Sequence, residues 1–217
     1  MLMDKQLTDR ISQFFAPYPN RLYTKGQSLI WHDENPPGVI YLLAGTVGQY
    51  DINKNGQKIM LNIFKPSAFF PLSWAINHTP NVYFFEALSD VECKIAPAER
   101  VVDFLQLNSD VTFDLLGRVF KGTDGLLKRL NEAMTGTARS QLMLELAIST
   151  YRFGILNADG SHTIKIKTTE LATRTGMSRE TISRELKKLA EQDIITNNRG
   201  HITVHNVDML YEKLKMP

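Results

Sequence analysis

Residues 168–189 read TTELATRTGMSRETISRELKKL, and this stretch predicts two short helices joined by a tight turn. Thr168 is a suitable N-cap for the first helix, and Gly176 supplies the left-handed residue at which that helix ends. Ser178 is a suitable N-cap for the second helix, whose apolar residues recur at steps of four and three and would pack against the first helix. These apolar residues are Ile182, Leu186 and Leu189. The stretch therefore predicts a helix-turn-helix.

The other side of the second helix is polar and carries side chains that can read DNA bases. Arginine can donate two hydrogen bonds to guanine O6 and N7, and glutamate can accept one from cytosine N4. A recognition helix inserts its first turns into the major groove, so we expect Arg179 and Glu180 to contact bases. The full set of predicted DNA-contacting residues is Thr168, Thr169, Ser178, Arg179, Glu180, Ser183, Arg184, Lys187 and Arg199.

Residues 193–204 follow these helices and predict a β-hairpin, with strands at 193–196 and 201–204 and a turn at 197–200. Such a hairpin would be the wing of a winged helix-turn-helix domain. The alternative is an ordinary amphipathic helix pair whose polar side is only solvated. The glycine-ended turn, the Ser-Arg-Glu start of the second helix and the hairpin favour DNA binding over that alternative.

Residues 178–184 (SRETISR), with Gly176 before them and the hairpin after them, resemble the CRP/FNR family of bacterial transcription regulators. The resemblance covers nearly the whole chain and is strongest from about Lys165 onward. It implies a homodimer that binds palindromic double-stranded DNA with TGA in each half-site, and RNA polymerase as a further partner. The base-reading roles of the family would fall on Arg179, Glu180 and Arg184. We also expect Arg179 to require an additional G·C pair.

The composition fits a chain of one ordinary domain and a second small one, of which one binds an acidic partner. With 217 residues and 43% hydrophobic content, the chain is long enough for one ordinary domain and a second small one. Residues 165–199 contain eight Lys or Arg and five Asp or Glu, whereas the rest of the chain has 17 basic and 18 acidic residues. The positive charge is therefore concentrated in the predicted helix-turn-helix region.

The sequence also indicates the compartment. Cys93 is the single cysteine, which excludes an intrachain disulfide framework. No apolar run approaches the roughly 18 residues of a membrane span, and the first ten residues lack the apolar region of a signal peptide. We therefore expect a cytoplasmic protein that has no membrane-spanning segment.

Residues 21–97 contain short apolar or alternating runs broken by turn residues, which is an all-β pattern. Asn55-Gly56 between two of these runs is a strong hairpin signal, so we interpret residues 53–56 as a structural turn and not a ligand loop. Residues 4–15 predict a short helix before the strands. The family resemblance implies that the strands form a jelly-roll-like β-roll sensor. The expected strands are 28–31, 39–43, 46–50, 58–64, 82–88 and 91–95.

Residues 66–72 (PSAFFPL) lie where the resemblance implies a cyclic nucleotide-binding cassette, and they depart from it. Pro71 stands in place of a glycine and removes a backbone N–H, and Leu72 stands in place of the ribose-binding glutamate. Asn81 aligns near the phosphate-binding arginine, and residues 22–99 contain no arginine. Because a buried phosphate needs a charge-assisted partner, we expect that cyclic AMP is not the effector.

Aromatic residues are concentrated around this degenerate cassette, and two interpretations of them stay open. They line a hydrophobic pocket for an unknown small-molecule effector, or they fill the vacated site as part of the core, which alternating aromatic residues in strands favour. A haem ligand at His78 is a further alternative, but the sequence predicts neither a cofactor nor a metal site, and Cys93 alone cannot hold an iron–sulfur cluster. The residues assigned to the possible pocket are Phe69, Phe70, Leu72, Trp74, Tyr83, Phe85 and Asp124.

From residue 98 onward the apolar period is helical, and residues 109–135 predict one long helix. Its apolar residues fall at alternating steps of three and four, the a/d seam of a two-stranded coiled coil. The seam packs either on its own β-roll or on a second copy, and the resemblance favours the second copy. Beside the seam, Leu115, Phe120 and Leu127 are expected to cover the roll. The seam residues are Leu116, Val119, Thr123, Leu126, Leu130 and Ala133.

The sequence thus predicts an α+β chain with an N-terminal β-roll sensor (1–108), a dimerisation helix (109–135) and a C-terminal winged helix-turn-helix domain (136–217). Shorter helices are expected at 98–107, 138–153 and 207–214, with a hinge at 135–137. The histidines match no catalytic motif spacing, so we do not expect an enzyme. Two other functions stay open: a constitutive or architectural DNA-binding protein with a vestigial sensor, and a regulator that senses an apolar ligand or a haem-bound gas. An architectural protein would show little preference for a palindrome.

Overall fold

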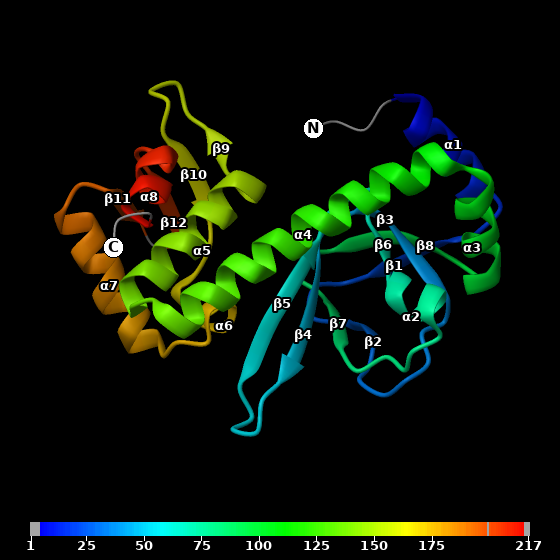
Figure 1. The fold of residues 1–217 in the computed structure, drawn as a ribbon, viewed down its shortest axis with the longest axis horizontal. Helices are drawn as coiled ribbons and strands as arrows, with labels where there is room; N and C mark the ends of the chain where they lie inside the picture. The colour runs from blue at the N-terminus through cyan, green and yellow to red at the C-terminus, as the bar shows by residue number, and fades with distance from the viewer. Residues whose placement is uncertain (1–4, 199, 215–217) are drawn as a thin grey trace. The chain divides into compact units, whose positions relative to one another are not determined.

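The computed structural model describes residues 5–198 and 200–214. The chain forms two units, Met1–Val119 and Phe120–Pro217 (Figure 1). The long helix α4 (Ser109–Thr135) contributes its first part to one unit and its second part to the other, and its bounds agree with the predicted ones. In the described ranges, no helix combines the length and the apolar character that crossing a membrane requires.

The first unit is built on two four-stranded antiparallel sheets, as predicted for a β-roll. One sheet has the order β1 (Asn20–Tyr23), β8 (Val91–Ala96), β3 (Val39–Ala44), β6 (Phe69–Phe70). The other has the order β2 (Ser28–Ile30), β7 (Phe84–Ala87), β4 (Val47–Ile52), β5 (Lys58–Phe64). The β4–β5 hairpin turns where the sequence predicts it, and Gly56 there has a φ of 74°, which glycine adopts without strain.

Two apolar clusters hold this unit together. One fills the space between the sheets and includes Phe70, Phe85 and Cys93. Burial raises the pKa of the Cys93 thiol to about 11, so this thiol stays protonated at neutral pH. The second cluster joins the other side of β3 and β8 to the surrounding helices. These helices are α1 (Lys5–Phe15), α2 (Leu72–Asn77), α3 (Ala98–Leu107) and the start of α4.

The second unit contains a helical core and one four-stranded sheet of order β11-β12-β10-β9. Its first full helix starts at a capping box in which the Thr137 and Ser140 side chains each bond the other residue's backbone N–H. Its helices after α4 are α5 (Ala138–Phe153), α6 (Thr168–Thr175), α7 (Arg179–Glu191) and α8 (Val207–Leu214). Its strands are β9 (Ile155–Leu156), β10 (His162–Lys165), β11 (Ile195–Asn198) and β12 (His201–Val204).

The structure corrects the sequence prediction at two places in this unit. Thr168 is the first residue of α6 and not its cap; Lys167 occupies the N-cap position, and no side chain bonds the helix N-terminus there. The first wing strand also lies two residues later than predicted, at Ile195–Asn198, because antiparallel pairing includes Asn197 and Asn198, which lie opposite Ile202 and His201. The predicted turn at 197–200 is therefore shorter.

Candidate nucleic-acid interface

Helices α6 and α7 are joined by residues 176–178 and form the predicted helix-turn-helix. Gly176 has a φ of 73°, and its N–H donates to the Ala172 carbonyl at 2.9 Å, which ends α6. The Ser178 hydroxyl accepts a hydrogen bond from the Thr181 N–H at 3.2 Å and caps α7. The turn is thus closed on both sides by hydrogen bonds that the sequence predicted.

The buried side of α7 packs in the core of the second unit. This core joins α5, α6, α7, the wing strands and α8 around Leu171, Ile182 and Leu186. The predicted DNA-contacting residues that belong to α7 lie on the opposite side, where the Lys187 side chain is 79% exposed. Thr168 is half-buried, and Arg199 lies outside the described residues. The exposed members of the set are Thr169, Ser178, Arg179, Glu180, Ser183, Arg184 and Lys187.

Two carboxylates on α7 are held in the charged form by their surroundings. A hydrogen bond with its own backbone, one with the Ser178 side chain and the nearby Arg179 charge lower the pKa of Glu180. Glu180 therefore remains a hydrogen-bond acceptor at neutral pH, the state that contact with cytosine N4 requires.

The second carboxylate, Glu185, was missed by sequence reasoning. It is buried and accepts hydrogen bonds from Lys188 Nζ at 2.9 Å and Arg184 Nε at 3.3 Å, which lower its pKa. The contact with Arg184 uses one of its five guanidinium donors and leaves the others available. The sequence signal that could have indicated a buried carboxylate was the position of Glu185 directly before the apolar Leu186.

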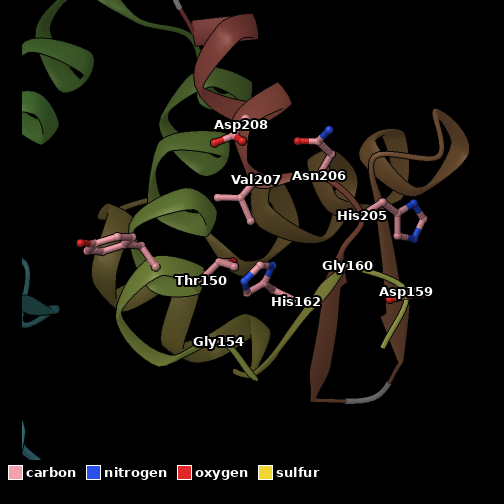
Figure 2. Close-up of a pocket in the computed structure, with 10 residues that line it drawn as sticks. Thr150, Gly154, Asp159, Gly160, His162, His205, Asn206, Val207 and Asp208 are labelled. Carbon is pink, nitrogen blue, oxygen red and sulfur yellow. The ribbon is translucent and has the colours of Figure 1, made fainter. Parts of the chain in front are cut away.

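A surface depression of about 680 Å³ lies elsewhere on this unit, between the end of α5, the β9–β10 turn and the start of α8 (Figure 2). None of its ten lining residues belongs to α7. Thr150 Oγ1 and His162 Nδ1 line it and are buried with no hydrogen-bond partner in the structure. An ordered water is the usual partner of such groups. His205 at the rim is held by Thr196 at 2.8 Å and by the Asp193 carbonyl at 2.7 Å, and so has a structural role.

The apolar residues of α4 divide into a buried and an exposed group. Val111 and Leu115 are buried in the first unit, as expected for Leu115. Phe120 and Leu127, which belong to the second unit, are exposed and widen the apolar face that the predicted seam forms. Thr123 and Ala133 of the seam are exposed as well. The exposed large apolar residues are Phe113, Leu116, Val119, Phe120, Leu126, Leu127, Leu130 and Met134.

The β-roll residues assigned to a possible effector pocket are divided between the two apolar clusters of the first unit. Phe70 and Phe85 are stacked at 5.5 Å between ring centroids, and Phe64 stacks on Phe70 at 4.5 Å. Tyr83 packs beside them, whereas Phe69, Leu72 and Trp74 belong to the other cluster. Asp124 is exposed on the part of α4 that belongs to the second unit. The stacked rings favour the core interpretation.

Asn81, which aligns near the phosphate-binding arginine, is buried, and its side-chain amide forms hydrogen bonds with backbone groups. Its Nδ2 donates to the Trp31 carbonyl at 2.9 Å and the Tyr83 carbonyl at 2.8 Å. Both amide donors are thus occupied. Lys94 Nζ likewise donates to three backbone carbonyls, the nearest being that of Tyr18 at 2.8 Å. His78 is exposed and ends α2 in a left-handed conformation.

Comparison with known proteins agrees with this geometry. The family model of the cyclic nucleotide-binding domain matches residues 20–108, and that of the Crp-like helix-turn-helix domain matches residues 140–213. The global nitrogen regulator of Nostoc sp. is 25% identical over 190 residues, which cover 84% of this chain and 83% of that protein.

Solved structures show the same fold. A CRP/FNR-family transcriptional regulator of Thermus thermophilus has a TM-score of 0.74 at 20% identity, covering 91% of this chain and 99% of its own. A mutant of CooA from Carboxydothermus hydrogenoformans has a TM-score of 0.77 at 18% identity, covering 94% and 91%. With a cyclic nucleotide-binding domain, a long helix and a Crp-like helix-turn-helix domain in this order, the chain belongs to the CRP/FNR family of DNA-binding transcription regulators.

Proposed function

We propose that this protein acts as a homodimer that reads palindromic DNA with TGA-containing half-sites through α7 and does so without cyclic AMP. The observation that carries the proposal is the composition of α7, which has a buried apolar side and an exposed side bearing Arg179, Glu180 and Arg184. Arginine and glutamate at these exposed positions supply the donors and the acceptor that base reading in the major groove requires. Phosphate contacts would come from the flanking residues, Lys187 among them.

The exposed apolar face of α4 supports the homodimer. A continuous face of this kind along a helix of 27 residues is more apolar surface than a soluble monomer normally leaves uncovered. Its residues occupy the a and d positions of a heptad and the position after d, which is the pattern of paired helices. Two-fold pairing would place two recognition helices in successive major grooves about 34 Å apart.

The occupied donors of Asn81 and Lys94 support independence from cyclic AMP, because neither side chain has a hydrogen bond to offer a phosphate without breaking a contact to the backbone. Leu72 has no carboxylate for the ribose. A second candidate is constitutive DNA binding by a protein with a vestigial sensor. The stacked rings of Phe64, Phe70 and Phe85 favour it, since they fill the interior of the roll. RNA polymerase remains an expected partner from the family resemblance.

Substituting Arg179 by alanine tests base reading by α7. We expect Arg179→Ala to weaken binding to the cognate site by about 1–3 kcal/mol and to relax the preference at one base pair. Lys187→Ala on the same side of the helix is the matched variant, and it should weaken all sequences similarly, because a phosphate contact carries no sequence information. Fluorescence anisotropy on cognate and scrambled duplexes at fixed salt measures both. If both variants weaken both duplexes equally, α7 does not read bases.

A further inference from the structure

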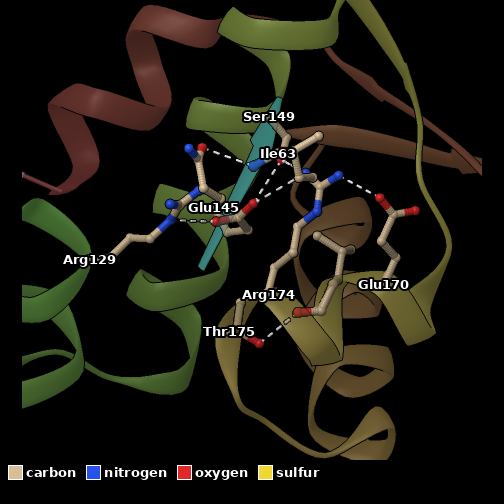
Figure 3. Close-up of polar contacts among 9 residues, drawn as sticks. Ile63, Arg129, Glu145, Ser149, Glu170, Arg174 and Thr175 are labelled. Atoms are coloured by element: carbon tan, nitrogen blue, oxygen red, sulfur yellow. Dashed lines mark hydrogen bonds and ion pairs between the residues drawn. The ribbon is translucent and has the colours of Figure 1, made fainter. Parts of the chain in front are cut away.

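Glu145 on α5 is a buried carboxylate shared by three helices (Figure 3). Its side chain is 2% exposed, and its Oε2 accepts a hydrogen bond from Arg129 Nε of α4 at 3.0 Å. Its Oε1 accepts one from the Ser149 hydroxyl at 2.9 Å and lies 3.4 Å from Arg174 NH1 of α6. Arg174 is itself nearly buried, donates to Ser149 at 2.7 Å and pairs with Glu170. One carboxylate therefore connects the end of the dimerisation helix to the first helix of the helix-turn-helix.

The charges around Glu145 show that its carboxylate is needed there. Burial and repulsion from Arg129 and Arg174 lower the pKa of Arg152, while Glu145 acts in the opposite direction. Three guanidinium groups thus lie near Glu145, and one of them, Arg174, also pairs with the half-exposed Glu170. Removing the buried carboxylate would leave like charges close together in a low-dielectric site, where they cannot stay packed.

The Arg129–Glu145 ion pair spans the break between α4 and α5. The sequence predicts a hinge at residues 135–137, and α4 does end at Thr135. However, the ion pair joins Arg129, which precedes this break, to Glu145, which follows it. In addition, Lys128 Nζ of α4 lies 6.0 Å from the ring centroid of Tyr211 on α8. The last turns of α4 are therefore attached to the DNA-binding unit by side chains as well as by the chain itself.

The same carboxylate also fixes the reading helix. Arg174 is held by Glu145 and Ser149, and its helix α6 packs on α7 through the shared core of Leu171 and Ile182. One chain of contacts from α4 to α7 therefore passes through Glu145. In a dimer paired along α4, the direction of α7 relative to α4 sets the distance between the two recognition helices, which must match the half-site separation.

We propose that Glu145 is a positioning residue that fixes the spacing of the two recognition helices, with Arg129 and Arg174 as its two attachments. The inference rests on the proposed function, because it needs a dimer paired along α4. The inference adds two points to that function. The Arg129–Glu145 ion pair holds α4 and α5 in a fixed orientation across the break at 135–137, and it thereby limits which half-site spacings the dimer can bind. Glu145 is buried, so its side chain is not placed to contact DNA, and it would act through α6 and α4.

Arg129→Gln is the variant that tests the inference. The Arg129 side chain is 26% exposed, so this change is milder than Glu145→Gln, which places an amide among the arginines. Binding is measured on three palindromes with identical half-sites: the preferred spacing, one base pair more and one base pair less. Thermal unfolding and sedimentation are recorded on the same samples. Lys121→Gln, on an exposed residue of α4, removes the same charge and is the matched control.

We expect Arg129→Gln to remain a folded dimer. Its preference for the native spacing over the other two spacings should fall about tenfold, because the variant should bind the native spacing more weakly while its binding to the other two changes less. Arg129→Lys, which keeps the charge, should restore part of the preference, and Lys121→Gln should behave as the parent. The inference is wrong if Arg129→Gln keeps the spacing preference, unfolds, or weakens all three duplexes equally with a lower melting temperature. If the parent is a monomer or has no preferred palindrome, the proposed function fails as well, so the two failures are distinguishable.

Discussion

Replacing Leu126 and Leu130 together by lysine is expected to produce a folded monomer that binds the palindromic site at least about 100-fold more weakly than the parent. Their side chains are 46% and 56% exposed, so the substitution removes little packing within the chain. In the proposed dimer it would bury four lysine side chains in an apolar seam, which pairing cannot tolerate. A monomer then binds one half-site only, and no second recognition helix is held near the other half-site at high effective concentration. The loss of this effect accounts for the expected weakening of about 100-fold.

Sedimentation equilibrium and fluorescence anisotropy on one palindrome measure the two effects of this double substitution. Leu107→Lys is the matched control, because Leu107 is 84% exposed on α3 and lies outside the seam. This control should stay dimeric and bind normally. A double variant that remains dimeric with parental affinity would mean that α4 is not the dimer interface.

Leu186→Ala is expected to lower the free energy of unfolding of the second unit by about 2–5 kcal/mol. The Leu186 side chain is 1% exposed and packs in the core that α5, α6, α7 and the wing share. Truncation leaves a cavity at the point where these elements meet, and this loss is a large fraction of the roughly 5–15 kcal/mol that stabilises a typical domain. DNA binding should fall with it, because this core holds the recognition helix in place.

Urea unfolding followed by far-UV circular dichroism checks the Leu186 prediction. Trp31 and Trp74 both lie in the first unit, so tryptophan fluorescence would report on the other unit. Lys187→Ala, one residue along, serves as the exposed control and should change the free energy by less than about 0.5 kcal/mol. Equal destabilisation by both changes would contradict the assignment of the buried and exposed sides of α7.

The long helices and the Ser178 cap of α7 could be predicted from the sequence, because their signals are local. Helix α4 was predicted from its apolar residues at alternating steps of three and four, and α7 from the Ser178 cap and its regular apolar spacing. The elements that were missed, β1, β6, α2 and β9, contain two to six residues. Such segments are too short to show a period and form only because neighbouring strands or helices supply their partners.

The contacts that define the sites were less predictable. Arg129 and Arg174, which contact Glu145, lie 16 and 29 residues from it in the sequence, and no local pattern links residues so far apart. The available signal was a charged residue between the apolar Leu142 and Leu146 on a helix predicted to be core. Likewise, the sequence showed that Asn81 is not an arginine, but only the structure shows that its amide ties two loops together.

Selection of duplexes from a randomised pool by the purified protein, with and without cyclic AMP, tests the central claim most directly. The bound fraction is sequenced in both conditions. The account predicts recovery of a palindrome whose half-sites contain TGA and are about one helical turn apart, and it predicts the same palindrome at the same enrichment when cyclic AMP is added. Recovery of a palindrome only with cyclic AMP would contradict the interpretation of Pro71, Leu72 and Asn81, and recovery of no preferred sequence would contradict base reading by α7.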